Sequence, residues 1–172
     1  MAGRKNNNRH RHGNGKVKLI PLGGVGEIGK NMFLIEYGGE ILVVDAGLAF
    51  PDEELLGIDI VIPDMTYVIE NKDKVRGIVL THGHEDHIGA LAYLLRDVNV
   101  PVYGTRLTLG LAMAKLREHN FGENDITLHR VNPGEQVKIG GFAVDFIRVN
   151  HSVADAVGLG IRTPAGTIVN PP

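Results

Sequence analysis

The sequence predicts an α/β (α+β) protein, a sheet with helices on its outer face, and two observations lead to that class. Short apolar and β-branched runs fill the first and last parts of the chain, whereas helical periodicity is concentrated in the centre. A strand at residues 75–80 also leads through one polar turn into a helix at residues 88–98. Strands, then helices, then strands again predict elements layered around a hydrophobic core. At 172 residues, we expect one domain or part of a larger one.

The first part of the chain is predicted to form three strands. Residues 17–22 make the first, and residues 33–37 and 41–44 make two more. Gly38 and Gly39 separate the last two strands, which is a hairpin signal because glycine adopts the positive φ values that tight hairpin turns need. The second and third strands are therefore predicted to pair as a hairpin.

The centre of the chain is predicted to hold the helices. A short helix is expected over residues 67–74, an amphipathic helix over 88–98 and a longer helix over 105–119, with strands at 75–80 and 101–103. In the longest helix, four apolar side chains fall near one face and are interpreted as core: Leu107, Leu111, Ala114 and Leu116. Strands are predicted again in the last part, over residues 126–131, 136–139, 142–149, 158–162 and 167–169.

The composition limits both the cell compartment expected for the chain and the residue types that could bind a metal. The chain is 43% hydrophobic and 22% charged, as in ordinary soluble globular proteins. It has no cysteine, so disulfides and thiolate ligands are excluded, and any metal is to be held by His, Asp or Glu. No apolar run approaches the length of a membrane span, and the N-terminus lacks the apolar segment of a secretory signal. We therefore expect no membrane association and a cytoplasmic location.

The N-terminal tail carries a charge asymmetry that the net charge of -2 hides. Residues 1–15 are polar and rich in Asn and Gly, so we expect them to be a disordered tail. Residues 1–18 contain no acid but several basic side chains: Arg4, Lys5, Arg9, Arg11, Lys16 and Lys18. Such a tail either contacts phosphates in a salt-dependent way or binds nothing, and both alternatives stay open. His10 and His12 are assigned to the tail rather than to a site.

The residues with the clearest chemistry are at positions 81–87, which have the sequence THGHEDH. Three histidines and two carboxylates lie between a strand and a helix, and imidazole and carboxylate are ligand types that suit zinc. His82 and His84, two residues apart, are able to point to the same side of an extended turn. Asp86 and His87, at the helix start, are able to face a second ion. We therefore predict a two-metal site in preference to a solvated polar turn.

The segment GVGEIG at residues 24–29 matches the dinucleotide-binding fingerprint GxGxxG, and Asp45 lies at about the right distance downstream. That fingerprint requires a helix to begin at the glycines, so that its N-terminus holds the pyrophosphate. Residues 31–40 instead predict a strand and a Gly-Gly turn, which leaves no room for a crossover helix. We therefore reject nucleotide binding and interpret the glycines as a sharp loop with close backbone approach.

Two further polar residues lie at the ends of predicted strands. Asp45 follows the apolar run at residues 41–44, where a buried carboxylate needs a partner. It either orients a metal-ligating histidine or is satisfied by turn amides, and both alternatives stay open. His151 follows the strand at residues 142–149 and is a candidate third imidazole for the first metal.

The remaining titratable residues near these motifs are given other roles. Glu85 is expected to face solvent, because its neighbours already complete the ligand pattern. His119 and His129 are interpreted as surface or structural residues. Asp155 either contacts a ligand or caps its turn.

These residues resemble the metallo-β-lactamase superfamily, whose HxHxDH signature is specific and is present at residues 82–87. Asp45 matches the family's earlier aspartate motif, and His151 matches its later histidine motif. The finer similarity is to the ribonuclease J family, in the β-CASP branch that acts on nucleic acids, and it extends over residues 17–169. The segments that carry it are LGGVGEIGKN at 22–31, DAG at 45–47, FP at 50–51, LGID at 56–59, PD at 63–64, PVYG at 101–104, HS at 151–152 and TP at 163–164.

The resemblance implies the αββα sandwich of that superfamily, of which this chain supplies the first half, and two catalytic zinc ions. The implied metal ligands fall into two sets: His82, His84 and His151 for one ion, and Asp86 and His87 for the other. Asp45 and Asp86 are the expected catalytic carboxylates, Asp45 by supporting the site.

The implied activity is hydrolysis of RNA phosphodiester bonds, as an endonuclease and a 5′-to-3′ exonuclease, in rRNA maturation and mRNA decay. Metal-activated hydroxide attacks phosphorus in line in such a mechanism. RNA is the implied partner, and a homo-oligomer (dimer or tetramer) is implied for the complete protein. Two alternatives stay open: another hydrolase of the same fold, acting on a thioester or lactone, and a non-catalytic RNA-binding or assembly module.

The C-terminal end departs from the family pattern. In the family, the strand that matches residues 167–169 runs on into a Gly-Asp motif whose aspartate bridges both metals, whereas here Asn170, Pro171 and Pro172 follow. The β-CASP domain and the second half of the metallo-β-lactamase domain are also unmatched. We therefore interpret residues 16–172 as the N-terminal part of a metallo-β-lactamase domain, and expect this part alone to bind metal weakly and to cleave poorly.

Overall fold

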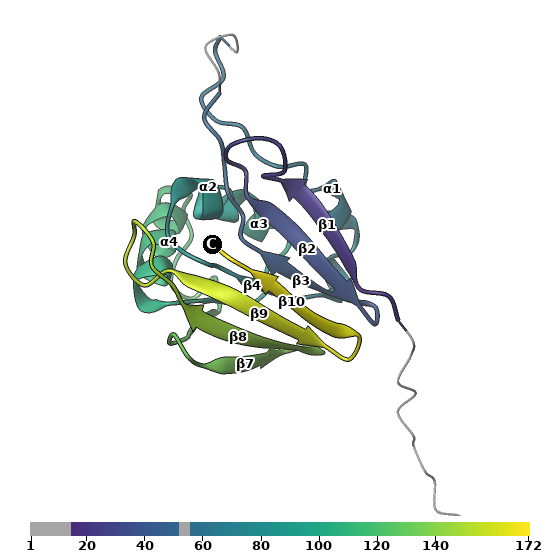
Figure 1. The fold of residues 1–172 in the computed structure, drawn as a ribbon. Helices are drawn as coiled ribbons and strands as arrows, with labels where there is room; N and C mark the ends of the chain where they lie inside the picture. The colour runs from purple at the N-terminus through teal and green to yellow at the C-terminus, as the bar shows by residue number, and fades with distance from the viewer. Residues whose placement is uncertain (1–14, 52–55) are drawn as a thin grey trace, which may run out of the picture.

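The computed structural model describes residues 15–51 and 56–172, and these residues form a six-stranded sheet, a four-stranded sheet and a layer of helices. The helices cover one face of the larger sheet, and the smaller sheet packs on its other face (Figure 1). Of the expected tail, only Gly15 belongs to the described residues. No helix in these two described ranges combines the length and the apolar character needed to cross a membrane. The predicted α/β class, with helices outside the sheet, is confirmed.

The strands of the larger sheet follow one another in chain order. From edge to edge they are β1 (Lys18–Gly23), β2 (Met32–Tyr37), β3 (Glu40–Val44), β4 (Val75–Val79), β5 (Val102–Gly104) and β6 (Leu128–Arg130). The first three are antiparallel, and Gly38 and Gly39, both with positive φ, make the predicted hairpin turn. From β3 onward the neighbours are parallel. Central parallel strands are covered on both faces, and residues 41–44 are accordingly 0% exposed.

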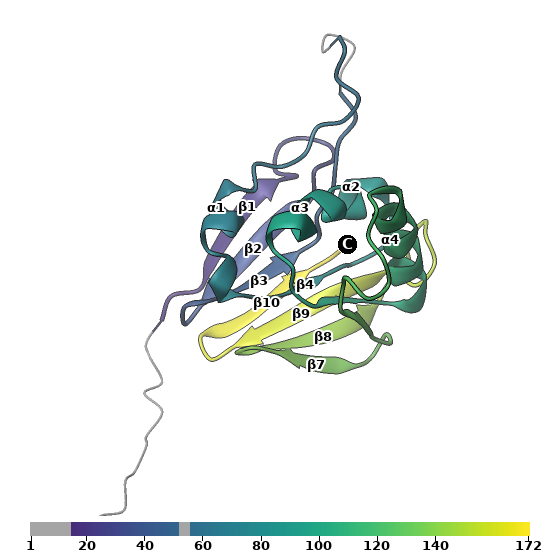
Figure 2. The same ribbon diagram turned by 180° about the vertical axis from the view of Figure 1, so that it is seen from behind.

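The helices lie on the outer face of this sheet (Figure 2). In the described part of the chain they are α1 (Thr66–Glu70), α2 (Glu85–Ile88), α3 (Leu91–Asp97) and α4 (Arg106–Glu118), with a 3₁₀ turn (Lys72–Lys74) after α1. Leu94, Ala112 and Leu116 from the helices share one core with Val43 and Ile78 from the sheet. This core holds the helices that follow the histidine turn against the strand that precedes it.

The smaller sheet is antiparallel throughout. Its order is β10 (Gly166–Asn170), β9 (Val157–Thr163), β8 (Phe142–Arg148) and β7 (Gln136–Ile139). Alternate side chains of β8, namely Phe142, Val144 and Phe146, are buried and share a core with Leu42 and Val44 of the larger sheet. The described residues therefore have a helix layer and two sheet layers, as expected for the first part of an αββα sandwich.

The predicted strands are all present, with modest shifts at their ends. The largest difference is at residues 126–131, where β6 is shorter than predicted and Ile126 is buried outside any strand. The short helix predicted over residues 67–74 is present as α1 and the 3₁₀ turn.

The helix predicted over residues 88–98 is present as α3 but begins only at Leu91, whereas Ile88 ends the separate helix α2, so the predicted start of this helix is wrong. The amide of Ala90 donates its hydrogen bond to the carbonyl of Ala46 (2.8 Å), on the segment after β3, and is therefore lost to the helical ladder. Gly89 packs directly on Leu48: a β-carbon added there would lie 2.5 Å from two carbons of that side chain. Tertiary contacts with the segment after β3 thus override the local periodicity.

The core face predicted for the longest helix is also wrong. Leu107 and Leu111 are each 38% exposed and Ala114 is exposed, so Leu116 alone of the predicted set is buried. The buried residues of α4 are Thr108, Leu109, Ala112, Met113 and Leu116. Two apolar stripes of this helix have helical spacing, and periodicity does not tell which one faces the sheet. The stripe that is buried includes a threonine whose hydroxyl is satisfied by a neighbouring hydroxyl at 2.9 Å.

The glycine-rich segment makes the sharp loop that the sequence predicts. Gly24, Gly26 and Gly29 have φ values of 80°, 73° and 88°, a region that favours glycine. Residues 24–31, all of them described, contain no helix, and β2 begins directly after the loop. The chain therefore lacks, in this described segment, the helix that a dinucleotide fingerprint requires.

Phe146→Ala should destabilise the chain by about 3–5 kcal/mol, because it removes a large side chain from the core between the sheets. Phe146 is 1% exposed, whereas the next residue on the strand, Ile147, is 43% exposed and provides a matched control. Ile147→Ala should cost less than about 1 kcal/mol. Urea denaturation of both variants measures the difference, and equal losses would contradict the placement of Phe146 in the core.

Candidate metal centre

The candidate centre lies where three chain segments meet beyond the ends of β3, β4 and β8. The amide of Asp45, just after β3, donates to the carbonyl of Val79 at the end of β4 (2.9 Å). The amide of Val157, at the start of β9, donates to the carbonyl of Thr81 (3.0 Å). This second bond draws the loop between β8 and β9, which carries His151, to the histidine turn.

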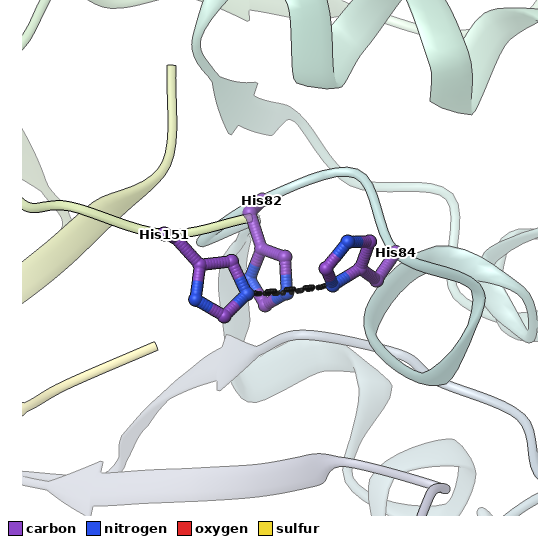
Figure 3. A group of neighbouring side chains, drawn as sticks. All are labelled: His82, His84 and His151. Carbon is purple, nitrogen blue, oxygen red and sulfur yellow. Dashed lines mark hydrogen bonds between the residues drawn. The ribbon is translucent and has the colours of Figure 1, made fainter. Parts of the chain in front are cut away.

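Three histidine side chains converge at this junction, as Figure 3 shows. Nε2 of His82 lies 3.0 Å from Nδ1 of His84 and 3.2 Å from Nε2 of His151. The nitrogens of His84 and His151 are 3.4 Å apart. His82 is buried, His84 is half-buried and His151 is exposed. The structure thus brings together two histidines of the turn and a third from a loop 69 residues beyond His82.

Hydrogen bonding assigns a tautomer to His82. Oγ1 of Thr81 donates to Oδ2 of Asp45 (2.8 Å), so this hydroxyl acts as an acceptor toward Nδ1 of His82, 3.0 Å away. Nδ1 therefore carries the ring proton, and Nε2 presents its lone pair to the other two histidines. A neutral ring with its second nitrogen hydrogen-bonded in this way is the state in which imidazole binds a metal.

The three facing nitrogens fit a cation better than they fit one another. A neutral imidazole offers one N–H donor and one acceptor, and the His82 nitrogen in the cluster is an acceptor. Whether one or both of the other two nitrogens carry a proton, at least one pair then consists of two lone pairs or of two N–H groups facing each other. All three ligand atoms lie within 4.8 Å of one another, so one ion between them could accept all three lone pairs. Three imidazoles are a donor set that zinc commonly takes.

Asp86 and His87 form a second set of candidate ligands. Nε2 of His87 is 3.6 Å from Oδ2 of Asp86, and its Nδ1 is 2.8 Å from Oδ2 of Asp45. A carboxylate only accepts, so Nδ1 of His87 donates to Asp45, and the neutral ring keeps its lone pair at Nε2. An imidazole nitrogen and a carboxylate oxygen therefore face each other at a separation that one ion could bridge. The rings of His87 and His82 have centroids 4.0 Å apart, so the two sets are adjacent.

Burial and charge act differently on these two rings. Burial, together with the neighbouring imidazoles, lowers the pKa of His82 to about 3, so its ring is neutral near pH 7. Burial also favours the neutral form of His87, but the hydrogen bond and charge of Asp45, with the charge of Asp86, outweigh it and raise the pKa of His87. Near pH 7 a cation therefore meets no competing proton at His82, whereas the raised pKa of His87 strengthens the competition from a proton there.

Two residues that the sequence analysis did not propose for the site shape it. Thr81 gives Asp45 two hydrogen bonds, from its amide to Oδ1 (2.8 Å) and from its hydroxyl to Oδ2 (2.8 Å). Nδ2 of Asn31 lies 3.0 Å from Oδ2 of Asp86 and 3.1 Å from Nε2 of His87. Both residues lie in segments that carry the family resemblance, and that was the available signal. Asp45 accepts hydrogen bonds both from a backbone amide and from Nδ1 of His87.

The remaining candidates lie outside the two ligand sets. The prediction that Glu85 only faces solvent is wrong. Its carboxylate pairs with the ammonium of Lys115 on α4 at 2.8 Å. His119 and His129, predicted to be surface or structural residues, each pack against a tyrosine ring and lie outside the histidine cluster. Asp155 has a left-handed backbone (φ 62°), and its main-chain carbonyl accepts a threonine hydroxyl at 3.0 Å.

Asp45→Asn should lower the pKa of His87. Burial, which lowers this pKa, remains in the variant, whereas the hydrogen bond and the charge of Asp45, which raise it, are weakened or lost. A raised folded-state pKa contributes stability that is fully present below the unfolded pKa of about 6.5 and is lost as the pH rises through the folded pKa. The stability difference between wild type and variant should therefore shrink as the pH rises through the wild-type pKa. An NMR titration of the metal-free proteins measures the pKa directly, and an unchanged value would contradict the role given to Asp45.

Comparison with known proteins identifies the family of the chain. Residues 25–168 match the family model of the metallo-beta-lactamase superfamily. Over 156 residues, the chain is 49% identical to ribonuclease J of Synechocystis sp. and 47% identical to ribonuclease J 2 of Staphylococcus saprophyticus. These matches cover 90% and 91% of this chain but 24% and 28% of the relatives. The chain thus spans about a quarter of the length of the curated relatives it matches.

A solved structure shows the same fold at much lower sequence identity. The metallo-beta-lactamase fold protein YhfI from Bacillus subtilis aligns with a TM-score of 0.58 and 18% identity, over 89% of this chain and 60% of that one. The range that matches the family model includes Asp45, the histidine turn and His151. The chain therefore belongs to the metallo-β-lactamase superfamily.

Proposed function

We propose that this chain is the metal-binding part of a zinc-dependent ribonuclease that hydrolyses RNA phosphodiester bonds. The observation that carries the proposal is the convergence of imidazole nitrogens and a carboxylate into two adjacent sets of metal ligands. RNA is proposed as the substrate because the ribonuclease J relatives are 49% and 47% identical over nearly the whole chain. Three imidazoles in one set favour zinc over the harder ions magnesium and calcium, which prefer oxygen ligands.

Each residue has a defined task in this proposal. The ligands divide into two sets, His82, His84 and His151 for the first ion and Asp86 and His87 for the second. Asp45 holds the proton of His87 at Nδ1, so that Nε2 is presented to the second ion. Thr81 does the same for His82. When bound, two such ions supply Lewis-acid polarisation of a phosphoryl oxygen and lower the pKa of a water molecule.

For the complete protein, the proposal includes endonuclease and 5′-to-3′ exonuclease activity in rRNA maturation and mRNA decay. It also includes a cytoplasmic location and a homo-oligomeric state. These features rest on the resemblance to the ribonuclease J family. Residues 16–172 are proposed to be the N-terminal part of its metallo-β-lactamase domain.

His84→Ala should weaken binding of the first zinc ion by at least about 100-fold, because it removes one of three imidazoles, and even indirect supporting contacts are worth about 10–100-fold in affinity. His119→Ala is the matched control, since it removes an imidazole of similar burial from a site away from the centre. Isothermal titration with zinc compares the two variants with the wild type. Unchanged zinc affinity in His84→Ala would contradict the assigned centre.

A hybrid protein tests the substrate class. When this chain replaces the matching segment of Synechocystis ribonuclease J, zinc-dependent cleavage of 5′-monophosphorylated RNA should persist, because the two sequences are 49% identical there. Thioesters and lactones should remain intact. Hydrolysis of either in place of RNA would favour another hydrolase of this fold. RNA binding without cleavage, unchanged by removal of metal, would favour a non-catalytic binding module.

A further inference from the structure

We propose that Asn31 is a positioning residue for the second ion, and that the glycine-rich loop holds its side chain in place. Asn31 acts through the ligands Asp86 and His87, which it links, rather than by binding the ion. The inference rests on the two-ion centre proposed above. The glycine-rich loop matches a dinucleotide fingerprint but leads into a strand. Its proposed role is to hold the side chain of Asn31.

The side-chain amide of Asn31 bridges the two ligands of the second set. Nδ2 carries two hydrogens, and the two acceptors within reach are Oδ2 of Asp86 (3.0 Å) and Nε2 of His87 (3.1 Å). Nε2 is an acceptor in the neutral ring because Nδ1 donates to Asp45. One amide group thus sets the distance between a carboxylate and an imidazole that come from adjacent residues at the start of α2.

An ion at Nε2 changes only one of these two contacts. The single lone pair of Nε2 goes to the ion, while Oδ2 of Asp86 keeps its hydrogen bond, since a carboxylate has further lone pairs for an ion. Removing Asn31 does not free Nε2 for the ion, because water then takes the same lone pair. Without Asn31, the carboxylate of Asp86 and the ring of His87 are no longer held in a fixed orientation before an ion binds.

The backbone of Asn31 is itself fixed on both sides. Its amide donates to the carbonyl of Asp86 (2.9 Å), and its carbonyl accepts from the amide of Gly47 (3.0 Å). Gly47 approaches so closely that an added β-carbon would lie 1.6 Å from the carbonyl oxygen of Asp86. The side chain of Asn31 therefore starts from a backbone position that is tied to the segment it orients.

Gly24 completes the support from the other side. A β-carbon added at Gly24 would lie 2.4 Å from Oδ1 of Asn31 and 3.2 Å from its Cα, so the loop backbone packs directly on the amide. Gly24 also has a φ of 80°, which favours glycine. Gly26 has a similar φ of 73°, but a β-carbon there would meet no atom within 4 Å. The two glycines thus share the backbone requirement and differ in their contact with Asn31.

Calorimetric titration of the chain with zinc measures the affinity of each ion and tests the proposal. Asn31→Ala should weaken the second ion by about 10-fold or more and leave the first ion unchanged, as expected for the loss of a group that orients metal ligands. Asn99→Ala, which removes an exposed amide that bonds only the carbonyl of Asp125 in the described contacts, should leave both ions unchanged. The metal-free melting temperature of each variant is recorded alongside.

Substitutions at Gly24 and Gly26 distinguish the effect of contact with Asn31 from the effect of backbone strain. Gly24→Ala should weaken the second ion as Asn31→Ala does, whereas Gly26→Ala should lower the melting temperature without weakening that ion. In the double variant with Asn31→Ala, the Gly24→Ala change should add little further loss of affinity, because its effect passes through the amide.

Three outcomes would overturn the inference. If the wild type binds two ions and Asn31→Ala binds both equally well, Asn31 has no positioning role and the two-ion centre stands. If Gly24→Ala and Gly26→Ala weaken the second ion equally, the loop acts through its backbone and not through Asn31. If the wild type binds only one ion, the two-ion centre fails, and the role of Asn31 fails with it.

Discussion

The buried carboxylate of Asp45 is the constraint on which the candidate centre depends. It is 3% exposed and accepts hydrogen bonds of 2.8 Å from the Thr81 amide, the Thr81 hydroxyl and Nδ1 of His87. A carboxylate removed from water is stable only with such partners, so these bonds determine how the chain after β3 meets the chain after β4. They also place the ring proton of His87 and, through Thr81, that of His82. One side chain thereby turns two lone pairs toward the places where cations are proposed to bind.

The layers of the fold explain why these segments meet. β3 and β4 are neighbouring parallel strands, so the residues that follow them emerge at the same edge of the sheet. The core between the sheets brings β8 and β9 against that sheet, and the loop between them carries His151 to the histidine turn. α2 is short because the amide of Ala90 bonds to the carbonyl of Ala46, in the segment that follows Asp45. The amides of Ala46 and Leu48 in turn donate to the carbonyls of His87 and Glu85, so backbone bonds tie α2 to that segment. The ligands are therefore held by backbone contacts as well as by side-chain packing.

Local patterns predicted most of the fold and most of the centre. The strands and the histidine turn follow from apolar runs and turn residues, and Asp45 and His151 were proposed because polar groups at strand ends need partners. Features set by tertiary contacts were not predictable. The break before α3 depends on one bond from Ala90, and the buried stripe of α4 depends on which of two equivalent faces meets the sheet. The role of Asn31 had no signal apart from the family resemblance of its segment, because its partners lie 55 and 56 residues away.

Anomalous diffraction at the zinc absorption edge, from crystals grown with zinc, would locate the ions relative to the proposed ligands. We expect two adjacent peaks. One lies among the ring nitrogens of His82, His84 and His151, and the other lies between Asp86 and Nε2 of His87. A first peak without a second would contradict the two-ion centre. Zinc bound elsewhere, with the three histidines in contact only with one another, would contradict the assignment of the site as a metal centre.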